Sequence, residues 1–262
     1  MPAEATTTRT DVGGARERAI AWRHARHADI CDTVRAWEHG HVARCVRLPD
    51  WWDFNSVRVE GPDPGIDAAA LIRAADTLQH GLRHRQIEVE DETAGARLRP
   101  AFEQRGWTVE RLVWLAHGGP APAGQEFEEV PFAETRGLRA EWARTLPWMT
   151  DEAAIARFLD HEDSVAEIRR SRTLLARDDG GAPAGYVTFV VQSGLAEVEQ
   201  AYMTPALRGR GIGGALVSAA VRSGGADETF IVADDEGDSK RLYERLGFEP
   251  VWIQHVFLSR PG

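Results

Sequence analysis

The chain contains 262 residues, of which 43% are hydrophobic and 27% are charged, a composition typical of a globular protein. Its formal net charge of -10 argues against general nucleic-acid binding and is compatible with a cationic substrate. No apolar run is long enough to span a membrane, and residues 1–10 lack the apolar core of a signal peptide. We therefore expect a cytoplasmic protein of one large or two small domains.

The first 117 residues predict a series of helices and strands. Residues 1–14 have no periodicity and are expected to form a flexible tail. Apolar residues at helical spacing predict a helix over residues 16–40. The aromatic residues Trp51, Trp52 and Phe54 are expected to pack in the core or at an interface. Further predicted elements are strands at 45–48, 86–90 and 109–116 and helices at 66–80 and 96–105.

Two cysteines, Cys31 and Cys45, are the only ones in the chain, so no disulfide framework is expected. They lie near four histidines, His24, His27, His39 and His41. These residues lack the close Cys-x-x-Cys or His-x-x-x-His pair that is typical of zinc fingers. We therefore expect no metal site.

A Gly- and Pro-rich stretch at residues 118–125 is the strongest predicted linker. It separates residues 15–117 from residues 126–262, which we expect to form two domains. The second segment predicts helices at 137–145, 152–160, 214–222 and 239–246 and strands at 173–176, 186–192, 195–203, 229–233 and 251–258. Hairpins followed by strand, helix and strand predict an α/β fold, with a mixed sheet and helices on its faces.

The most distinctive motif is the glycine-rich sequence at residues 208–214, between the strand at 195–203 and the helix at 214–222. Glycines let the backbone approach a ligand closely and turn its N–H groups toward it, at the positive end of the helix dipole. Arg208 and Arg210 add positive charge. Together these features predict a site for an anion such as a pyrophosphate.

The pattern Arg-x-x-Gly-x-Gly in this loop resembles the coenzyme A signature of the GNAT acyltransferase superfamily. Met-Thr-Pro at 203–205 and Leu-Tyr-Glu-Arg-Leu-Gly-Phe at 242–248 resemble further motifs of that superfamily, and the resemblance covers residues 127–259. It implies that acetyl-coenzyme A is the cofactor. The cofactor-binding residues that it implies are Ala201, Met203, Arg208, Gly209, Arg210, Gly211, Ile212, Gly213 and Gly214.

The resemblance also implies catalytic roles for three side chains. Tyr243 matches the family's general acid, which protonates the leaving thiolate. Glu197 matches the position where some members carry a general base, and Glu199 is expected on the same face of the strand. The two carboxylates would bind a cationic amine or act as the base, and their repulsion would raise the pKa of one of them. The alternative is that this face is simply solvated.

The two segments resemble a tandem GNAT arrangement, because residues 101–107 align with 242–248 and residues 65–67 with 211–213. Three replacements distinguish the first segment, namely Pro62 for Arg208, Asp67 for Gly213 and Phe102 for Tyr243. They remove a cation and a hydroxyl and place an anion where a phosphate would bind. We therefore expect residues 15–117 to be a degenerate GNAT-like domain that shapes or covers the substrate site.

The sequence therefore favours an acyl-coenzyme A-dependent N-acyltransferase that acts on a primary amine of a small molecule or peptide. Two alternatives remain open at this point, a non-catalytic acyl-coenzyme A sensor and a GNAT-fold transferase that uses aminoacyl-tRNA. The acidic composition argues against the tRNA alternative. We expect no nucleic-acid or membrane partner, and a monomer or homodimer.

Overall fold

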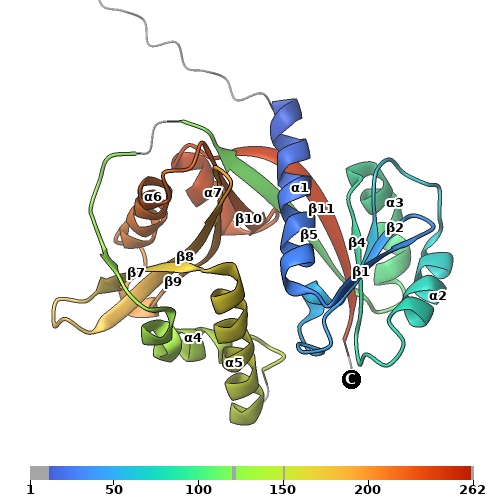
Figure 1. Cartoon of the computed structure of the whole chain (residues 1–262), viewed down its shortest axis with the longest axis horizontal. Coiled ribbons are helices and arrows are strands. Elements are labelled where there is room, and N and C mark those ends of the chain that lie inside the picture. The colour runs from blue at the N-terminus through green and yellow to red at the C-terminus, as the bar shows by residue number, and fades with distance from the viewer. Residues whose placement is uncertain (1–11, 120–121, 150, 261–262) are drawn as a thin grey trace, which may run out of the picture.

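Eleven strands form one mixed sheet in the computed structural model, which describes residues 12–119, 122–149 and 151–260 (Figure 1). The strands are β1 (Thr33–Trp37), β2 (Gly40–Arg44), β3 (Val57–Val59), β4 (Arg85–Val89), β5 (Thr108–His117), β6 (Glu128–Glu129), β7 (Arg172–Arg177), β8 (Pro183–Gln192), β9 (Leu195–Met203), β10 (Glu228–Asp234) and β11 (Glu249–Ser259). Their order across the sheet is β1-β2-β3-β4-β11-β5-β10-β9-β8-β7-β6. The predicted α/β fold with a mixed sheet and flanking helices is confirmed.

The helices lie on both faces of this sheet (Figure 1). They are α1 (Val12–Ile30), α2 (Ala68–Leu78), α3 (Glu92–Glu103), α4 (Arg136–Ala143), α5 (Glu152–Arg169), α6 (Ile212–Gly224) and α7 (Asp238–Arg245). α2 and α3 pack on the N-terminal strands, and α6 packs on β7, β8 and β9. α1 lies across the middle of the sheet, against β11. No helix in the described part of the chain is both long and apolar enough to cross a membrane.

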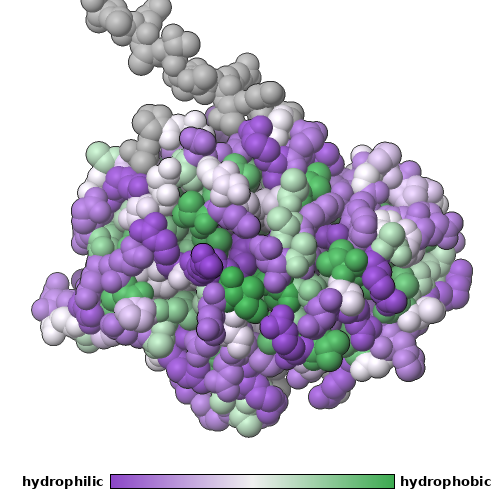
Figure 2. All heavy atoms as spheres, in the orientation of Figure 1, coloured by the Kyte–Doolittle hydropathy of each residue, from purple (hydrophilic) through white to green (hydrophobic). Residues whose placement is uncertain are grey.

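The central strands are buried on both faces. Val113 and Leu115 of β5 face the core beneath α6, whereas Trp114 and Ala116 face the core beneath α1, which includes Trp22. Strands that are buried on both faces have largely hydrophobic sequences, which explains why the strand at 109–116 could be predicted. Hydrophilic residues cover most of the face shown in Figure 2, with small hydrophobic areas between them.

The two halves of the chain exchange their last strands. β5, which ends the N-terminal half, lies between β10 and β11, and β11 lies between β4 and β5. All of these pairings of β5 and β11 are antiparallel. Each half of the chain therefore contributes one strand to the part of the sheet that the other half forms, and the division into domains at residues 15–117 and 126–262 stays a prediction.

The predicted helix over residues 16–40 is wrong in its second half, because α1 ends at Ile30 and the β1–β2 hairpin follows. Val34 and Trp37 are three positions apart, as in a helix, but both are half-buried residues of β1. Gly40, which resembled a helix end, has a φ of +147° and faces the Arg58 carbonyl, where a Cβ would stand 2.4 Å from the oxygen.

Three smaller predictions also need correction. The strand predicted at 45–48 is a turn in which the Leu48 N–H donates to the Cys45 carbonyl, and the strand ends at Arg44. Residues 1–11 of the predicted tail lie outside the described residues, whereas residues 12–14 begin α1. The helix predicted at 152–160 is too short, because α5 continues to Arg169. The residues that follow position 160 are mostly polar, but one of them, Glu162, is buried and pairs with Arg139.

Candidate active site

The parallel strands β9 and β10 pair only over their first residues. Their register runs from Leu195 opposite Glu228 to Val198 opposite Ile231. β9 continues to Met203, but the two strands are no longer paired there. The edge of β9 that faces β10 therefore has free backbone hydrogen-bonding groups beyond Val198, as a ligand that inserts between the strands requires.

A β-bulge lies at the point where the two strands separate. On the neighbouring strand β8, Thr188 pairs with Gln200 and Phe189 pairs with Val198, which leaves Glu199 as an extra residue in β9. A bulge bends the strand and redirects the side chain that it carries. The bulge thus accounts both for the separation of β9 from β10 and for the direction of the Glu199 side chain.

The glycine-rich loop follows β9 directly and ends at the start of α6. Gly209 and Gly211 have φ values of +78° and +81°, which favour glycine, and Gly211 is the N-cap of α6. Among the described residues, no acceptor bonds the N–H groups of residues 209–214, and the first helical bond is that from Ala215 to the Gly211 carbonyl. The loop therefore presents its N–H groups outward at the positive end of the helix, as predicted for an anion site.

The two arginines of this loop differ in their contacts. Arg208 donates from Nε to the Met203 carbonyl at 3.0 Å, and its guanidinium lies 5.8 Å from the centre of the Tyr202 ring. Arg210 is exposed and has no ion pair among the described residues. Ala201 and Met203 pair with Val187 and Gly185 of β8, so the opposite edge of β9 faces the gap toward β10. The predicted cofactor-binding residues thus form one continuous strip from the strand to the helix.

Tyr243 lies on α7 beside this strip. Its ring centre is 6.2 Å from that of Phe248, and it packs against the same core as Met203 and Ile212. The hydroxyl has no hydrogen-bond partner among the described residues. Burial raises the pKa of Tyr243 above its usual value, so the hydroxyl keeps its proton at neutral pH.

Glu197 is buried, with only 2% of its side chain exposed, and is held by residues from distant parts of the chain. It accepts a hydrogen bond of 2.6 Å from Trp22 Nε1 of α1. Arg26 lies 3.4 Å from one of its oxygens and Arg169 lies 3.5 Å from the other. Through these contacts Glu197 joins β9 to α1 and α5, and its carboxylate is occupied by residues of the protein itself.

Glu199 faces the same two arginines, at 4.0 Å from Arg26 and 3.7 Å from Arg169, and accepts a hydrogen bond of 3.0 Å from Ser171. Burial raises its pKa, the charge of Glu197 raises it further, and the two arginines oppose the shift. The expected common face of the two glutamates is therefore present, but it is covered by cations and is not a solvated surface. Only Glu199 also lines a cavity.

That cavity has a volume of about 840 Å³, within the usual range for small-molecule sites. Its wall combines the middle of β9 with α5, the segment around residues 50–53 and the end of β11. Six aromatic side chains line it, from Trp51, Trp52, Phe132, Trp142, Trp148 and Phe158. Glu162, which also lines it, has a pKa that burial raises to about 7.

Sequence reasoning missed most of this cavity. It assigned Trp51 and Trp52 to packing, and it gave no role to Arg26, Arg169 or Glu162, whose partners lie far away in the chain. The one available signal was the density of tryptophans and phenylalanines at residues 51–54 and 142–158. Aromatic residues at that density fit a ligand pocket as well as a core.

The corresponding loop of the N-terminal half has a different structure. Asp67 caps α2, and its carboxylate accepts a hydrogen bond of 2.8 Å from the Ala70 N–H. The Gly65 N–H donates to the carboxylate of Asp63 at 2.8 Å. The protein's own carboxylates therefore take the N–H groups that α6 leaves free. Phe102, which aligns with Tyr243, is fully buried.

Comparison with known proteins places this site in a family. Residues 136–248 match the Acetyltransferase (GNAT) family model. A mycothiol acetyltransferase of Nocardia farcinica (strain IFM 10152) is 41% identical over 102 residues, which are 37% of this chain and 33% of that protein. The match thus spans about a third of the length of this relative. Residues 136–248 therefore contain a GNAT acetyltransferase domain.

Solved structures show the same fold over a larger part of the chain. A GCN5-related N-acetyltransferase from Kribbella flavida has a TM-score of 0.61 at 21% identity and covers 95% of this chain and 96% of its own. A functionally unknown conserved protein from Staphylococcus epidermidis ATCC 12228 has a TM-score of 0.74 at 14% identity, with coverages of 88% and 95%. A tandem GNAT protein from the clavulanic acid biosynthesis pathway has a TM-score of 0.52 at 15% identity, with coverages of 78% and 75%. These identities support the shared fold alone.

Proposed function

We propose that this protein is an acetyl-coenzyme A-dependent N-acetyltransferase that acts on a primary amine of a small molecule or peptide. The observation that carries the proposal is the continuity of the site. The anion-binding loop at residues 209–214 leads along the free edge of β9 to Glu199, which lies in the wall of an aromatic cavity.

The residues present fit the cofactor. The N–H groups at the start of α6, which are free among the described residues, suit the pyrophosphate, and Arg210 adds a positive charge that has no ion pair in that part of the chain. The edge of β9 at Ala201 and Met203 offers backbone groups to the amides of the pantetheine arm. When bound, acetyl-coenzyme A supplies the acetyl group as an activated thioester.

Glu199 and Tyr243 divide the proton transfers between them. Glu199 is placed to accept a proton from the amine, because it lines the cavity and a raised pKa makes a carboxylate a better base near neutral pH. Tyr243 holds its proton at Oη and is the donor on the cofactor side of the site. The aromatic wall and the carboxylates of Glu162 and Glu199 favour an amine with an apolar or aromatic body.

The N-terminal half, at residues 15–117, is proposed to bind no coenzyme A. Calorimetry with coenzyme A is expected to give one site per chain, and thiol release from acetyl-coenzyme A across an amine panel is expected to show turnover. Binding without release for any amine would support the sensor alternative instead. Two equivalent sites would contradict the proposal that the N-terminal half is degenerate.

Glu199→Gln is expected to remove the acidic limb of the pH–rate profile. Glu199 can act as a base only when it is deprotonated, so the rate of the parent is expected to fall as the pH falls through the pKa of Glu199. Because that pKa is raised, the rate falls at a higher pH than it would for an ordinary glutamate. The measurement is kcat at saturating amine over pH.

Glu197→Gln is the matched control. It removes a charge from the pair of arginines without touching the cavity, so it is expected to lower the melting temperature. The acidic limb of the pH profile is expected to remain but to move to lower pH, because the Glu197 charge no longer raises the pKa of Glu199. Loss of the acidic limb in Glu197→Gln with its retention in Glu199→Gln would reverse the two roles.

A further inference from the structure

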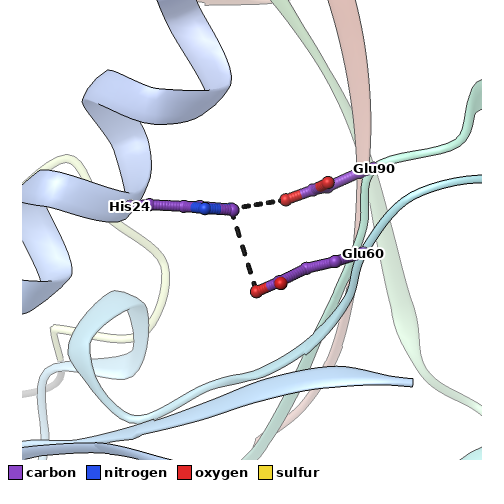
Figure 3. A group of neighbouring side chains, drawn as sticks. All are labelled: His24, Glu60 and Glu90. Carbon is purple, nitrogen blue, oxygen red and sulfur yellow. Dashed lines mark hydrogen bonds and ion pairs between the residues drawn. The ribbon is translucent and has the colours of Figure 1, made fainter. Parts of the chain in front are cut away.

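A cluster of one histidine and two glutamates lies in the N-terminal half, away from the proposed acceptor cavity. Figure 3 shows His24 of α1 pointing toward Glu60 and Glu90. Glu60 follows β3 directly, and Glu90 follows β4. Because β3 and β4 are parallel, with Val59 opposite Val89, the two glutamates leave the sheet at the same edge.

This edge is the N-terminal counterpart of the place where β9 and β10 separate. Glu60 is the first residue after the last parallel pair, as Glu199 is in the C-terminal half. Here the strand ends are bridged by a hydrogen bond from the Glu90 N–H to the Val59 carbonyl, and α1 covers them with His24. The degenerate half thus has a polar cluster where its partner has the mouth of the proposed cofactor cleft.

The geometry of the three ligand atoms suits a metal ion. His24 Nε2 lies 2.6 Å from Glu90 Oε1 and 3.8 Å from Glu60 Oε1, and all three ligand atoms lie within 4.8 Å of one another. Zinc bonds to nitrogen and oxygen of about 2.0–2.2 Å place tetrahedral ligands about 3.4 Å apart. Shifts of less than about 1 Å in flexible side chains would reach that spacing.

A hydrogen bond between His24 and Glu90 does not account for the whole cluster. Glu60 Oε1 is buried and accepts no hydrogen bond among the described residues, although Arg58 Nε lies 2.9 Å away as an ion pair. This ion pair satisfies the carboxylate oxygen in part, and a metal ion would complete its coordination. The two carboxylates and the Arg58 guanidinium together carry one net negative charge, which balances one of the two charges of a divalent ion. Arg58 therefore lowers the affinity of the site for the ion.

The surroundings also hold the ligands in place. His41 Nδ1 lies 2.8 Å from Glu60 Oε2, and the Gly61 N–H donates to Glu90 Oε2 at 3.3 Å. Such contacts to the outer oxygen of each carboxylate are typical of the second layer of residues around a metal. His24 is 31% exposed, which gives an ion a route from solvent.

We propose that His24, Glu60 and Glu90 bind a divalent first-row transition metal ion, for which Zn²⁺ is the probe of choice. The imidazole nitrogen favours such ions over Mg²⁺ and Ca²⁺, which prefer oxygen ligands alone. Water completes the coordination. The ion would fasten α1 to the strand ends of the N-terminal half, which is a structural role. The expected absence of a metal site was drawn from Cys31, Cys45 and the four histidines near them, of which only His24 belongs to this cluster.

The test is calorimetric titration of the EDTA-treated full chain with Zn²⁺ and, separately, Mg²⁺, together with melting curves. One Zn²⁺ per chain is expected, bound more tightly than Mg²⁺ and raising the melting temperature. His24→Ala and Glu60→Gln are each expected to weaken Zn²⁺ binding by at least about tenfold. His80→Ala removes an exposed histidine outside the cluster and is expected to bind as the parent does.

Glu60→Gln keeps the size of the side chain, so it tests the site even if His24→Ala does not fold. The proposal is overturned if the parent binds no Zn²⁺ up to about 1 mM. It is also overturned if both folded variants bind Zn²⁺ as the parent does, or if Zn²⁺ and Mg²⁺ bind equally. None of these readouts depends on acetyl transfer, so the proposed activity and the proposed metal site can fail separately.

Discussion

Gly211→Glu is expected to weaken coenzyme A binding by roughly a hundredfold or more, because like charges brought together in a site cost several kcal/mol and each 1.4 kcal/mol is tenfold in affinity. Gly211 is the N-cap of α6, and a Cβ there would meet no atom within 4 Å. The new carboxylate would therefore enter the space beside the free N–H groups without disturbing the core. Calorimetry with coenzyme A measures the loss.

Gly225→Glu provides the matched control for this prediction. Gly225 caps the other end of α6, has a φ of +58° and also has open space around it. Both variants therefore carry the left-handed backbone strain, of about 1–2 kcal/mol, and the same added charge. An equal loss of affinity in the two variants, or a normal affinity in folded Gly211→Glu, would remove the loop from the cofactor site.

Tyr243→Phe is expected to lower kcat about a hundredfold, the lower end of what general acid–base catalysis contributes, with little change in coenzyme A affinity. The substitution keeps the ring that packs against Phe248 and removes only the proton donor. Steady-state kinetics and calorimetry on the same preparation separate the two effects.

Tyr186→Phe is the control for the loss of a tyrosine hydroxyl. The Tyr186 side chain is fully buried and its hydroxyl has no hydrogen-bond partner, so its removal is expected to leave turnover unchanged. If Tyr243→Phe also retained full turnover, Tyr243 would be a packing residue and the proton would come from elsewhere.

The parts of the fold that were predictable have local causes. The strand at 195–203 was predicted to the residue, because its ends are marked by the Ser193-Gly194 turn and by Pro205. The loop at residues 208–214 was identifiable because glycines with positive φ leave a direct trace in the sequence. For the corresponding N-terminal loop, the sequence indicated only that the Asp67 charge would repel a phosphate, whereas in the structure this carboxylate accepts a hydrogen bond from the Ala70 N–H.

The parts that were not predictable depend on distant residues. Nothing near Glu197 in the sequence indicates that Trp22 and Arg26, more than 170 residues earlier, enclose it. The bulge at Glu199 exists only relative to its partner strand β8. The pairing of β5 with β10 and β11 joins elements that are not neighbours in the chain, and periodicity specifies a strand but not its neighbour.

The exchange of β5 and β11 has a consequence for how the protein is made. β11 is the last of the strands in the described residues, yet it lies between β4 and β5. During translation, both of these strands therefore have an unpaired edge until the ribosome has released residues 249–259. Exposed strand edges promote aggregation, and pairings between distant segments fold slowly. The nascent chain thus depends on its last strand for protection against misassembly.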